Sequence, residues 1–206
     1  MRDALEAKPV SVFNLASEDL NLIGGLDMGS VEGTAVISTN LISPVGTGFE
    51  HVKRYSVKEA VLSNGWPIRI GFLGIADPRM VKPNSGFSAK DPLSAIAEVL
   101  PEIKDNVDLV VVIGEMTEET ADKIAGKFPE VYAVLRSERS FRMTKPRQVS
   151  NALIMSSVER GRMLGQLTLS LDSEKKVASY TYKYVDLNQR VKSDPALAAR
   201  AGELSK

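Results

Sequence analysis

The chain has 206 residues, enough for one domain with a substantial core or at most two small ones. Its 26 basic and 26 acidic residues cancel, which argues against a nucleic-acid binder driven by bulk phosphate attraction. No apolar run is long enough to span a bilayer, and we expect no secretion signal at the amino terminus. Cysteine is absent and His51 is the single histidine, which excludes thiolate chemistry and most histidine-based sites.

The first half of the chain predicts strands and a hairpin. Apolar and β-branched runs at 9–16 and 34–42 are typical of strands, and a glycine-rich loop joins them. Asn64-Gly65 is the strongest hairpin signal in the chain, so we expect a turn there and a returning strand at 67–76. That returning strand is almost entirely apolar or glycine towards its end, which predicts burial on both faces.

The middle of the chain alternates helices and strands. Helical spacing of apolar residues follows Asp91, a suitable N-cap, and Pro92, a residue typical of a first helical turn. A short apolar strand comes next, then a second helix that opens at Thr117, then a strand at 131–135. This order implies right-handed crossovers and parallel pairing of the strands.

After residue 150 the pattern changes to three consecutive strands, which we expect to pair antiparallel and to form a second sheet, and Asp194-Pro195 opens a last helix. The fold class is therefore α/β, with two packed mixed β-sheets flanked by helices. The domain organisation is one domain over 1–188 and an exit helix over 189–206. The main-sheet strands are expected at 10–14, 35–38, 69–75, 109–113 and 131–135, the helices at 92–104 and 118–127, and the second-sheet strands at 152–156, 161–171 and 176–185.

A polar turn follows the strand at 131–135. The stretch EVYAVLRSERS passes from apolar residues into five polar ones, and polar groups at the end of a buried strand are typical of enzyme sites. The basic residues beyond it, from Arg139 to Arg147, indicate a solvated loop, with anion binding as the alternative. His51 lies among charged residues and indicates an ordinary surface position.

Seven segments carry a resemblance that covers nearly the whole chain. In chain order they are VSVFNLASEDL, AVISTNL, PIRIGFLGIADP, VDLVVVIGEM, EVYAVLRSERS, ERGRMLGQLTLSLD and YVDLNQRVKSDPALAA. They resemble the metallophosphoesterase (calcineurin-like) domain of the 5'-nucleotidase family, and the sixth segment is the sharpest match. The resemblance implies a site with two metal ions that activate water and clamp the phosphoryl oxygens of a phosphate ester.

The metal-ligand positions depart from the family pattern. The family's first-loop Asn and His fall at about Ser17 and Glu18, a later His falls at Glu115, and the last two fall at about Ser137 and Arg139. The family's opening strand, with its Asp-x-His and Gly-Asp motifs, has no counterpart, so we expect an incomplete domain. By resemblance, the former metal-site positions are Ser17, Glu18, Asp19, Glu115, Ser137, Glu138 and Arg139.

Two hypotheses for the function follow. The first is a catalytically degenerate domain that acts as a binding or structural module without a cofactor. The alternative is a metal-dependent phosphoester (nucleotide) hydrolase, completed by a missing N-terminal segment or a partner chain. An oxygen-only site for a divalent ion such as magnesium or calcium would use Glu18, Asp19, Glu115 and Glu138, which are otherwise solvated loop acids.

Partners follow from the same resemblance. Missing strands would leave bare strand edges and apolar surface, so we expect self-association or a second polypeptide. A phosphate-containing small molecule is a candidate ligand, and neither nucleic acid nor a membrane span is expected. Relatives in the family are often extracytoplasmic, but the sequence leaves the localisation open.

Overall fold

The computed structural model describes residues 11–21, 33–43, 49–137, 145–157 and 162–188, together with a few positions between 191 and 199. Its largest layer is a six-stranded mixed sheet in the order β4-β5-β7-β8-β10-β9. The four central strands, β5, β7, β8 and β10, run parallel, and the outer pairs are antiparallel. The strands are β4 (Tyr55–Val61), β5 (Pro67–Ile75), β7 (Leu109–Glu115), β8 (Val131–Ser137), β9 (Arg147–Val149) and β10 (Ala152–Ser156).

The predicted hairpin joins β4 to β5. Gly65 has a φ of 84°, a backbone conformation that residues with a side chain rarely adopt, and the N–H of Leu62 donates to the carbonyl oxygen of Trp66 at 2.8 Å. Trp66, which follows the turn, keeps 47% of its surface exposed. His51 lies on the surface, as predicted, at the end of a short 3-10 helix (Phe49–His51).

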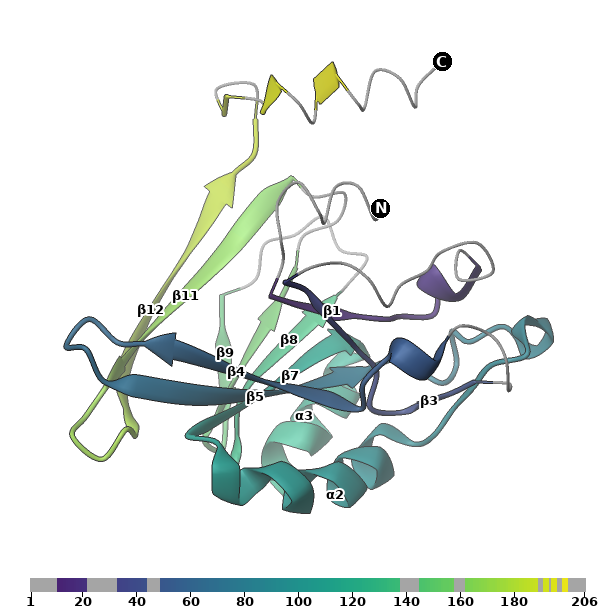
Figure 1. Cartoon of the computed structure of the whole chain (residues 1–206), viewed down its shortest axis with the longest axis horizontal. Helices are drawn as coiled ribbons and strands as arrows, with labels where there is room; N and C mark the ends of the chain where they lie inside the picture. Colours follow the sequence, from purple (N-terminus) through teal and green to yellow (C-terminus); the bar gives the residue numbers. More distant parts are fainter. Residues whose placement is uncertain are drawn as a thin grey trace.

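Two helices cover one face of the main sheet (Figure 1). The side chain of Asp91 accepts a hydrogen bond from the N–H of Ser94 at the start of α2 (Pro92–Ile103), and Thr117 caps α3 (Glu118–Lys127) in the same way. Both helix starts are confirmed. Among the described residues, no helix is long and apolar enough to cross a membrane.

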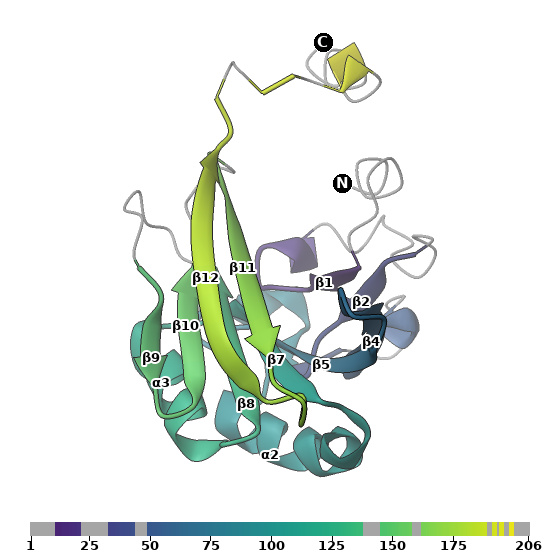
Figure 2. The ribbon, with the colours of Figure 1, turned by 90° about the vertical axis from the view of Figure 1, so that its left-hand side faces the viewer.

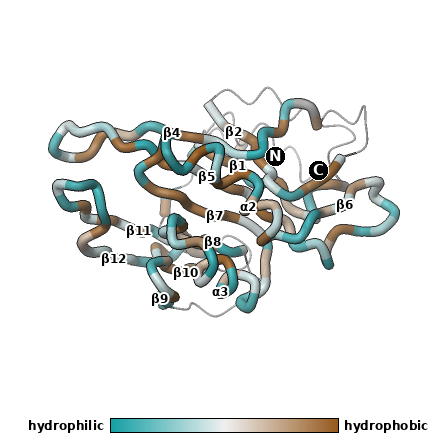
Figure 3. Tube along the Cα trace, turned by 90° about the horizontal axis from the view of Figure 1, so that it is seen from below, coloured by the Kyte–Doolittle hydropathy of each residue, from teal (hydrophilic) through white to brown (hydrophobic). Residues whose placement is uncertain are grey.

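The main hydrophobic cluster lies between these helices and the sheet. It joins Ile96 of α2 and Ile124 of α3 to Val112, Val134 and Ile154 of the sheet. Because the cluster includes residues on both sides of position 145, the core is not divided there. Figure 3 shows that the apolar residues concentrate along the central strands.

Three two-stranded sheets complete the described fold: β1 (Val12–Asn14) with β2 (Ala35–Ile37), β3 (Leu41–Ile42) with β6 (Ser88–Ala89), and β11 (Met163–Leu171) with β12 (Val177–Asp186). The prediction that 10–14 and 35–38 join the main sheet is wrong, since β1 and β2 form a separate parallel pair, which an isolated parallel bridge from Ile37 to Lys53 links to the chain just before β4. The reason is that both edges of β5 are already taken, by β4 on one side and β7 on the other.

The placement of 152–156 also differs from the prediction. This segment is β10, and it pairs in parallel with β8 within the main sheet rather than antiparallel with 161–171. All five of its residues are buried, which is typical of a strand in a parallel sheet. The next two strands form the antiparallel β11–β12 ribbon as predicted. Most of the predicted exit helix lies outside the described residues, although the N–H of Ala198 donates to the carbonyl oxygen of Asp194 at 2.9 Å.

Candidate functional site

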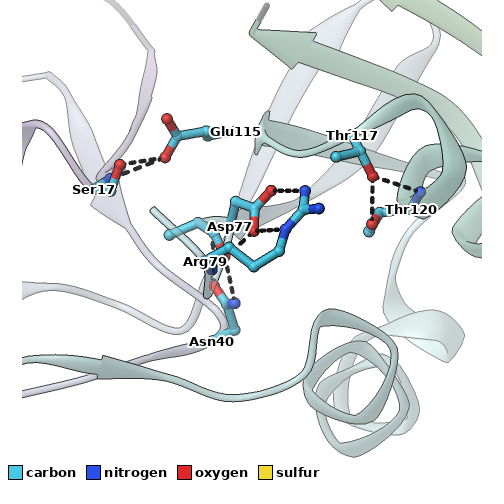
Figure 4. A network of polar contacts seen from close by, with 8 residues as sticks. Ser17, Asn40, Asp77, Arg79, Glu115, Thr117 and Thr120 are labelled. Carbon is cyan, nitrogen blue, oxygen red and sulfur yellow. Dashed lines mark hydrogen bonds and ion pairs between the residues drawn. The ribbon is translucent and has the colours of Figure 1, made fainter. Parts of the chain in front are cut away.

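Polar side chains gather where the parallel strands end. Ser17 and Asp19 follow β1, Asp77 follows β5, and Glu115 is the last residue of β7. The carboxyl ends of parallel strands are where α/β proteins usually bind ligands. Figure 4 shows Ser17, Asp77 and Glu115 together with Thr117, at the amino end of α3.

Ser17 and Glu115 form the tightest contact of this group. The Ser17 hydroxyl donates to Oε2 of Glu115 at 2.5 Å, and the Ser17 N–H donates to the same oxygen at 3.3 Å. Ser17 is 6% exposed, so this charge-assisted pair lies largely out of water. The contact joins the loop after β1 to the end of β7, across 98 residues of sequence.

Asp19 lies beside this pair. Its carboxylate accepts a hydrogen bond from the N–H of Ala16 at 2.9 Å. Burial raises the pKa of Asp19, the bond from Ala16 lowers it, and the negative charge of Glu115 raises it again. Asp19 and Glu115 are therefore close enough to interact, and together they could hold a shared cation or act as acceptors for the protein's own donors.

Asn40 is a second centre of the polar network. It is 1% exposed, and its Nδ2 donates to the carbonyl oxygens of Ala76 at 2.8 Å and Lys90 at 3.0 Å, while its Oδ1 accepts from the N–H of Ala76 at 2.9 Å. These bonds fasten the loop after β2 to the end of β5. Asn40 belongs to the AVISTNL motif, but sequence reasoning did not single it out as a site residue.

Asp77 is the other group that sequence reasoning missed. It is 7% exposed and holds the more exposed Arg79 through two hydrogen bonds, at 3.0 Å to Nε and 2.6 Å to Nη2. The hydrogen bond from the Arg79 side chain lowers the pKa of Asp77 more than burial raises it. Asp77 is the last residue of the GIAD segment, so its place just after a buried strand was the available signal.

Asn14 anchors β1 on the main sheet between two glycines. Its Nδ2 donates to the carbonyl oxygen of Ile75 at 2.9 Å. A Cβ added at Gly74 would collide with Oδ1 of Asn14, and one added at Gly114, which has a φ of 147°, would collide with the carbonyl oxygen of Ile75. These two positions therefore require glycine, because Asn14 and the backbone of β5 fill the space.

The structure brings together three of the predicted site residues, Ser17, Asp19 and Glu115. Ser137 is exposed at the end of β8 and lines a cavity with Asp19, whereas Glu18 is exposed on the loop. Glu138 and Arg139 lie outside the described residues. Within the described part of the chain, no group of three or more His, Cys, Asp or Glu side chains is arranged to hold a metal ion.

The cavity beside this network has a volume of about 470 Å³. Its wall is mainly apolar, with Phe13 from β1, Leu135 from β8 and Met155 from β10. Asp19 and Ser137 are among the polar residues that line it. Arg136 also borders the cavity, but it shares the strand face of Val134, which packs in the helix-covered core. The cavity therefore presents an apolar surface rather than a cluster of cations.

The comparisons place this arrangement among known folds. No family model matches the chain. The uncharacterized metallophosphoesterase YunD of Bacillus subtilis is 28% identical over 140 residues, which cover 67% of this chain and 29% of YunD. This chain therefore spans less than a third of the length of that relative.

Solved structures agree on the fold. A 5'-nucleotidase precursor from Thermus thermophilus matches 98% of this chain and 44% of its own, with a TM-score of 0.76 and 16% identity. The calcineurin-like phosphoesterase YfkN of Bacillus subtilis matches 99% of this chain and 72% of its own, with a TM-score of 0.73 and 14% identity. The sulfate thiohydrolase SoxB of Thermus thermophilus matches 99% and 38%, with a TM-score of 0.77 and 14% identity. The chain is thus a metallophosphoesterase-like domain in fold, as its seven motifs predict.

Proposed function

We propose that this metallophosphoesterase-like domain does not hydrolyse phosphate esters by itself and acts as a binding or structural module. The contact between Ser17 and Glu115 carries the proposal. Glu115 stands where the family places a metal-binding histidine, and here its Oε2 accepts both the hydroxyl and the N–H of Ser17. Because the Glu115 carboxylate accepts hydrogen bonds from within the protein, we infer that this residue stabilises the structure rather than binding a metal ion.

The ligand requirements of a two-metal phosphoesterase also support a non-catalytic role. Such a site holds its ions about 4 Å apart, each with several ligands, so that one activates water and both clamp the phosphoryl oxygens. At the corresponding positions this chain has a serine hydroxyl that donates to Glu115 and an aspartate that accepts from the N–H of Ala16. Both contacts stabilise the loop after β1, so these two side chains have a structural role that does not require a metal ion.

The cavity supports the binding side of the proposal. Phe13, Leu135 and Met155 give it an apolar wall, and the negative charge of Asp19 in the lining disfavours a bare phosphate. These features favour an apolar ligand. The resemblance also implies a phosphate-containing small molecule as a second class of ligand, and AMP is the simplest probe for that class.

A metal-dependent hydrolase is the second candidate, completed by a segment or chain beyond this one. The observation in its favour is that Asp19 and Glu115 lie close enough for the charge of Glu115 to raise the pKa of Asp19. A divalent ion held by these two carboxylates, with Glu18 and Glu138 as further oxygen ligands, would supply a Lewis acid for phosphate chemistry.

The effect of metal ions on unfolding separates the two candidates. If Asp19 and Glu115 hold an ion, manganese at a hundred times its dissociation constant stabilises the chain by about 2.7 kcal/mol, and Glu115→Gln removes that gain. We expect no manganese-dependent gain in the unmodified chain. The matched control is Glu119→Gln, which removes an exposed carboxylate that forms a salt bridge with Lys123 on α3.

A manganese-dependent stabilisation that Glu115→Gln abolishes and Glu119→Gln leaves intact would contradict the proposal and favour the hydrolase.

A further inference from the structure

A second cavity lies under the β11–β12 ribbon, at the amino ends of the parallel strands. Its volume is about 770 Å³, within the usual range for sites that bind small molecules. The main sheet contributes Tyr132, near the start of β8, and the ribbon contributes Tyr180 of β12. Figure 2 shows the ribbon in front of the central strands. This cavity is separate from the one beside Asp19, which lies at the opposite ends of β8 and β10.

The two tyrosines supply accessible aromatic surface in this cavity. Leu109 and Leu153 also line it, but they are only 8% and 1% exposed, whereas Tyr132 and Tyr180 are half-buried. Burial raises the pKa of Tyr132, and the negative charge of an ionised Tyr180 raises it further, so the two hydroxyl groups lie near each other. Aromatic rings attract organic cations over their faces, and groups of such rings bind ammonium ions.

Both cations in the lining already have carboxylate partners. Lys175, at the tip of the ribbon, donates to Oδ1 of Asp108 at 3.1 Å. The other carboxylate oxygen of Asp108 accepts the N–H of Arg69 at 2.7 Å, which fixes the carboxylate on the sheet. Lys176 forms a salt bridge with Glu174 at 2.6 Å. The described lining therefore holds no unpaired cation that would attract an anionic ligand.

Glu130 carries the unpaired charge of the cavity. It lies just before β8 with an exposed side chain, and no described residue forms an ion pair with its carboxylate. Three carboxylates and two ammonium groups line the cavity, so its formal net charge is one negative unit. Gln148 and Asn151 add amide oxygens that can accept hydrogen bonds from an ammonium group. A complementary ligand therefore carries one positive charge.

We propose that this cavity binds a small organic ammonium ion, whose charge pairs with Glu130 and whose apolar part lies against Tyr132 and Tyr180. A bare metal ion would need several convergent oxygen ligands, and no such group exists among the described residues. The inference goes beyond the role proposed above, because it assigns a ligand class to a cavity that none of the described former metal-site positions lines.

The test compares three probes that share a phenyl group and differ in charge. They are phenethylamine, phenethyl alcohol and phenylacetate, which are positive, neutral and negative at neutral pH. NMR titration of the full chain follows the backbone amides of Gln148 and Asn151, with Ser137 in the other cavity as the reference. We expect saturable shifts at Gln148 and Asn151 with a dissociation constant of about 1 mM for the amine, on the order expected for a ligand of this size. We expect the alcohol to bind at least fivefold more weakly and the acid not to bind.

Two variants of the lining make the test specific. Glu130→Gln removes the charge alone, so phenethylamine should bind at least fivefold more weakly and phenethyl alcohol with unchanged affinity. Tyr180→Leu keeps an apolar side chain without the aromatic face, and we expect it to weaken the amine more than the alcohol. The matched control is Glu119→Gln, an exposed carboxylate on α3 outside the cavity, which should leave both affinities unchanged. Thermal melting verifies that each variant is folded.

Three results would overturn the inference. The first is the absence of saturable shifts at Asn151, whether or not Ser137 shifts instead. The second is equal affinity for the amine and the alcohol, and the third is a folded Glu130→Gln variant that binds the amine as tightly as the unmodified chain does. Turnover of phosphate esters would contradict the proposed function but leave amine binding standing, so the two can fail separately.

Discussion

Replacing Asn40 with alanine tests whether the polar network at the strand ends holds the fold together. The change removes three buried hydrogen bonds, two to the backbone of Ala76 and one to the carbonyl oxygen of Lys90. Each bond contributes about 1 kcal/mol net, and a buried partner left without a bond costs about 1–3 kcal/mol. We expect Asn40→Ala to lower the free energy of unfolding by about 3 kcal/mol, which corresponds to a fall in Tm of about 6–12 °C for a chain of this size.

Urea denaturation followed by circular dichroism measures this loss. Asn40→Asp keeps the acceptor for the N–H of Ala76 but replaces the two donated bonds with repulsion from two carbonyl oxygens, so a loss at least as large is expected. The control is Asn106→Ala at an exposed position, where the change stays within about 0.5 kcal/mol. A loss below about 1 kcal/mol for Asn40→Ala would refute the view that this side chain fastens the β2 loop to β5.

Three further predictions concern the same region. Gly114→Ala should prevent folding or lower stability by more than 3 kcal/mol, because its Cβ would meet the backbone of β5, and thermal melting measures the loss. Since the hydrogen bond from Arg79 lowers the pKa of Asp77, the stability from this pair is present above pH 3.8, the usual pKa of the group, and is lost as pH falls through the lowered pKa. Urea titrations from pH 7 to pH 2 should therefore show Asp77→Asn less stable than the unmodified chain at pH 7 and equal to it at the acid end, and a constant difference would contradict this. A double-mutant cycle with Ser17→Ala and Glu115→Gln should give a coupling of about 1–2 kcal/mol, and simple additivity would show that their contact contributes little.

Local signals in the sequence predicted the elements whose structure is decided locally. Asp91 and Thr117 begin helices because their side chains accept from N–H groups three residues away, and Asn64-Gly65 makes its turn within four residues. The placement of β10 is different, because a short apolar run of buried residues fits a parallel or an antiparallel strand equally well. Its partner, β8, is decided by the packing of the whole core.

The candidate site was predictable only in part for the same reason. Ser17, Asp19 and Glu115 followed from a resemblance that aligns them with known ligand positions. That Ser17 bonds to Glu115 could not be read from the sequence, since 98 residues separate them. Asn40 lies in a motif segment, but its role depends on main-chain groups of Ala76 and Lys90 that come close only in the folded chain. Asp77 bonds to Arg79, two residues further along, so its contact was open to sequence reasoning.

Hydrolysis of phosphate esters by the purified chain tests the central claim most directly. With p-nitrophenyl phosphate or a nucleoside monophosphate as substrate and manganese or zinc in the buffer, we predict no turnover above that of buffer and metal alone. Metal-dependent turnover that disappears in Glu115→Ala or Glu138→Ala would contradict the account and identify the chain as a hydrolase.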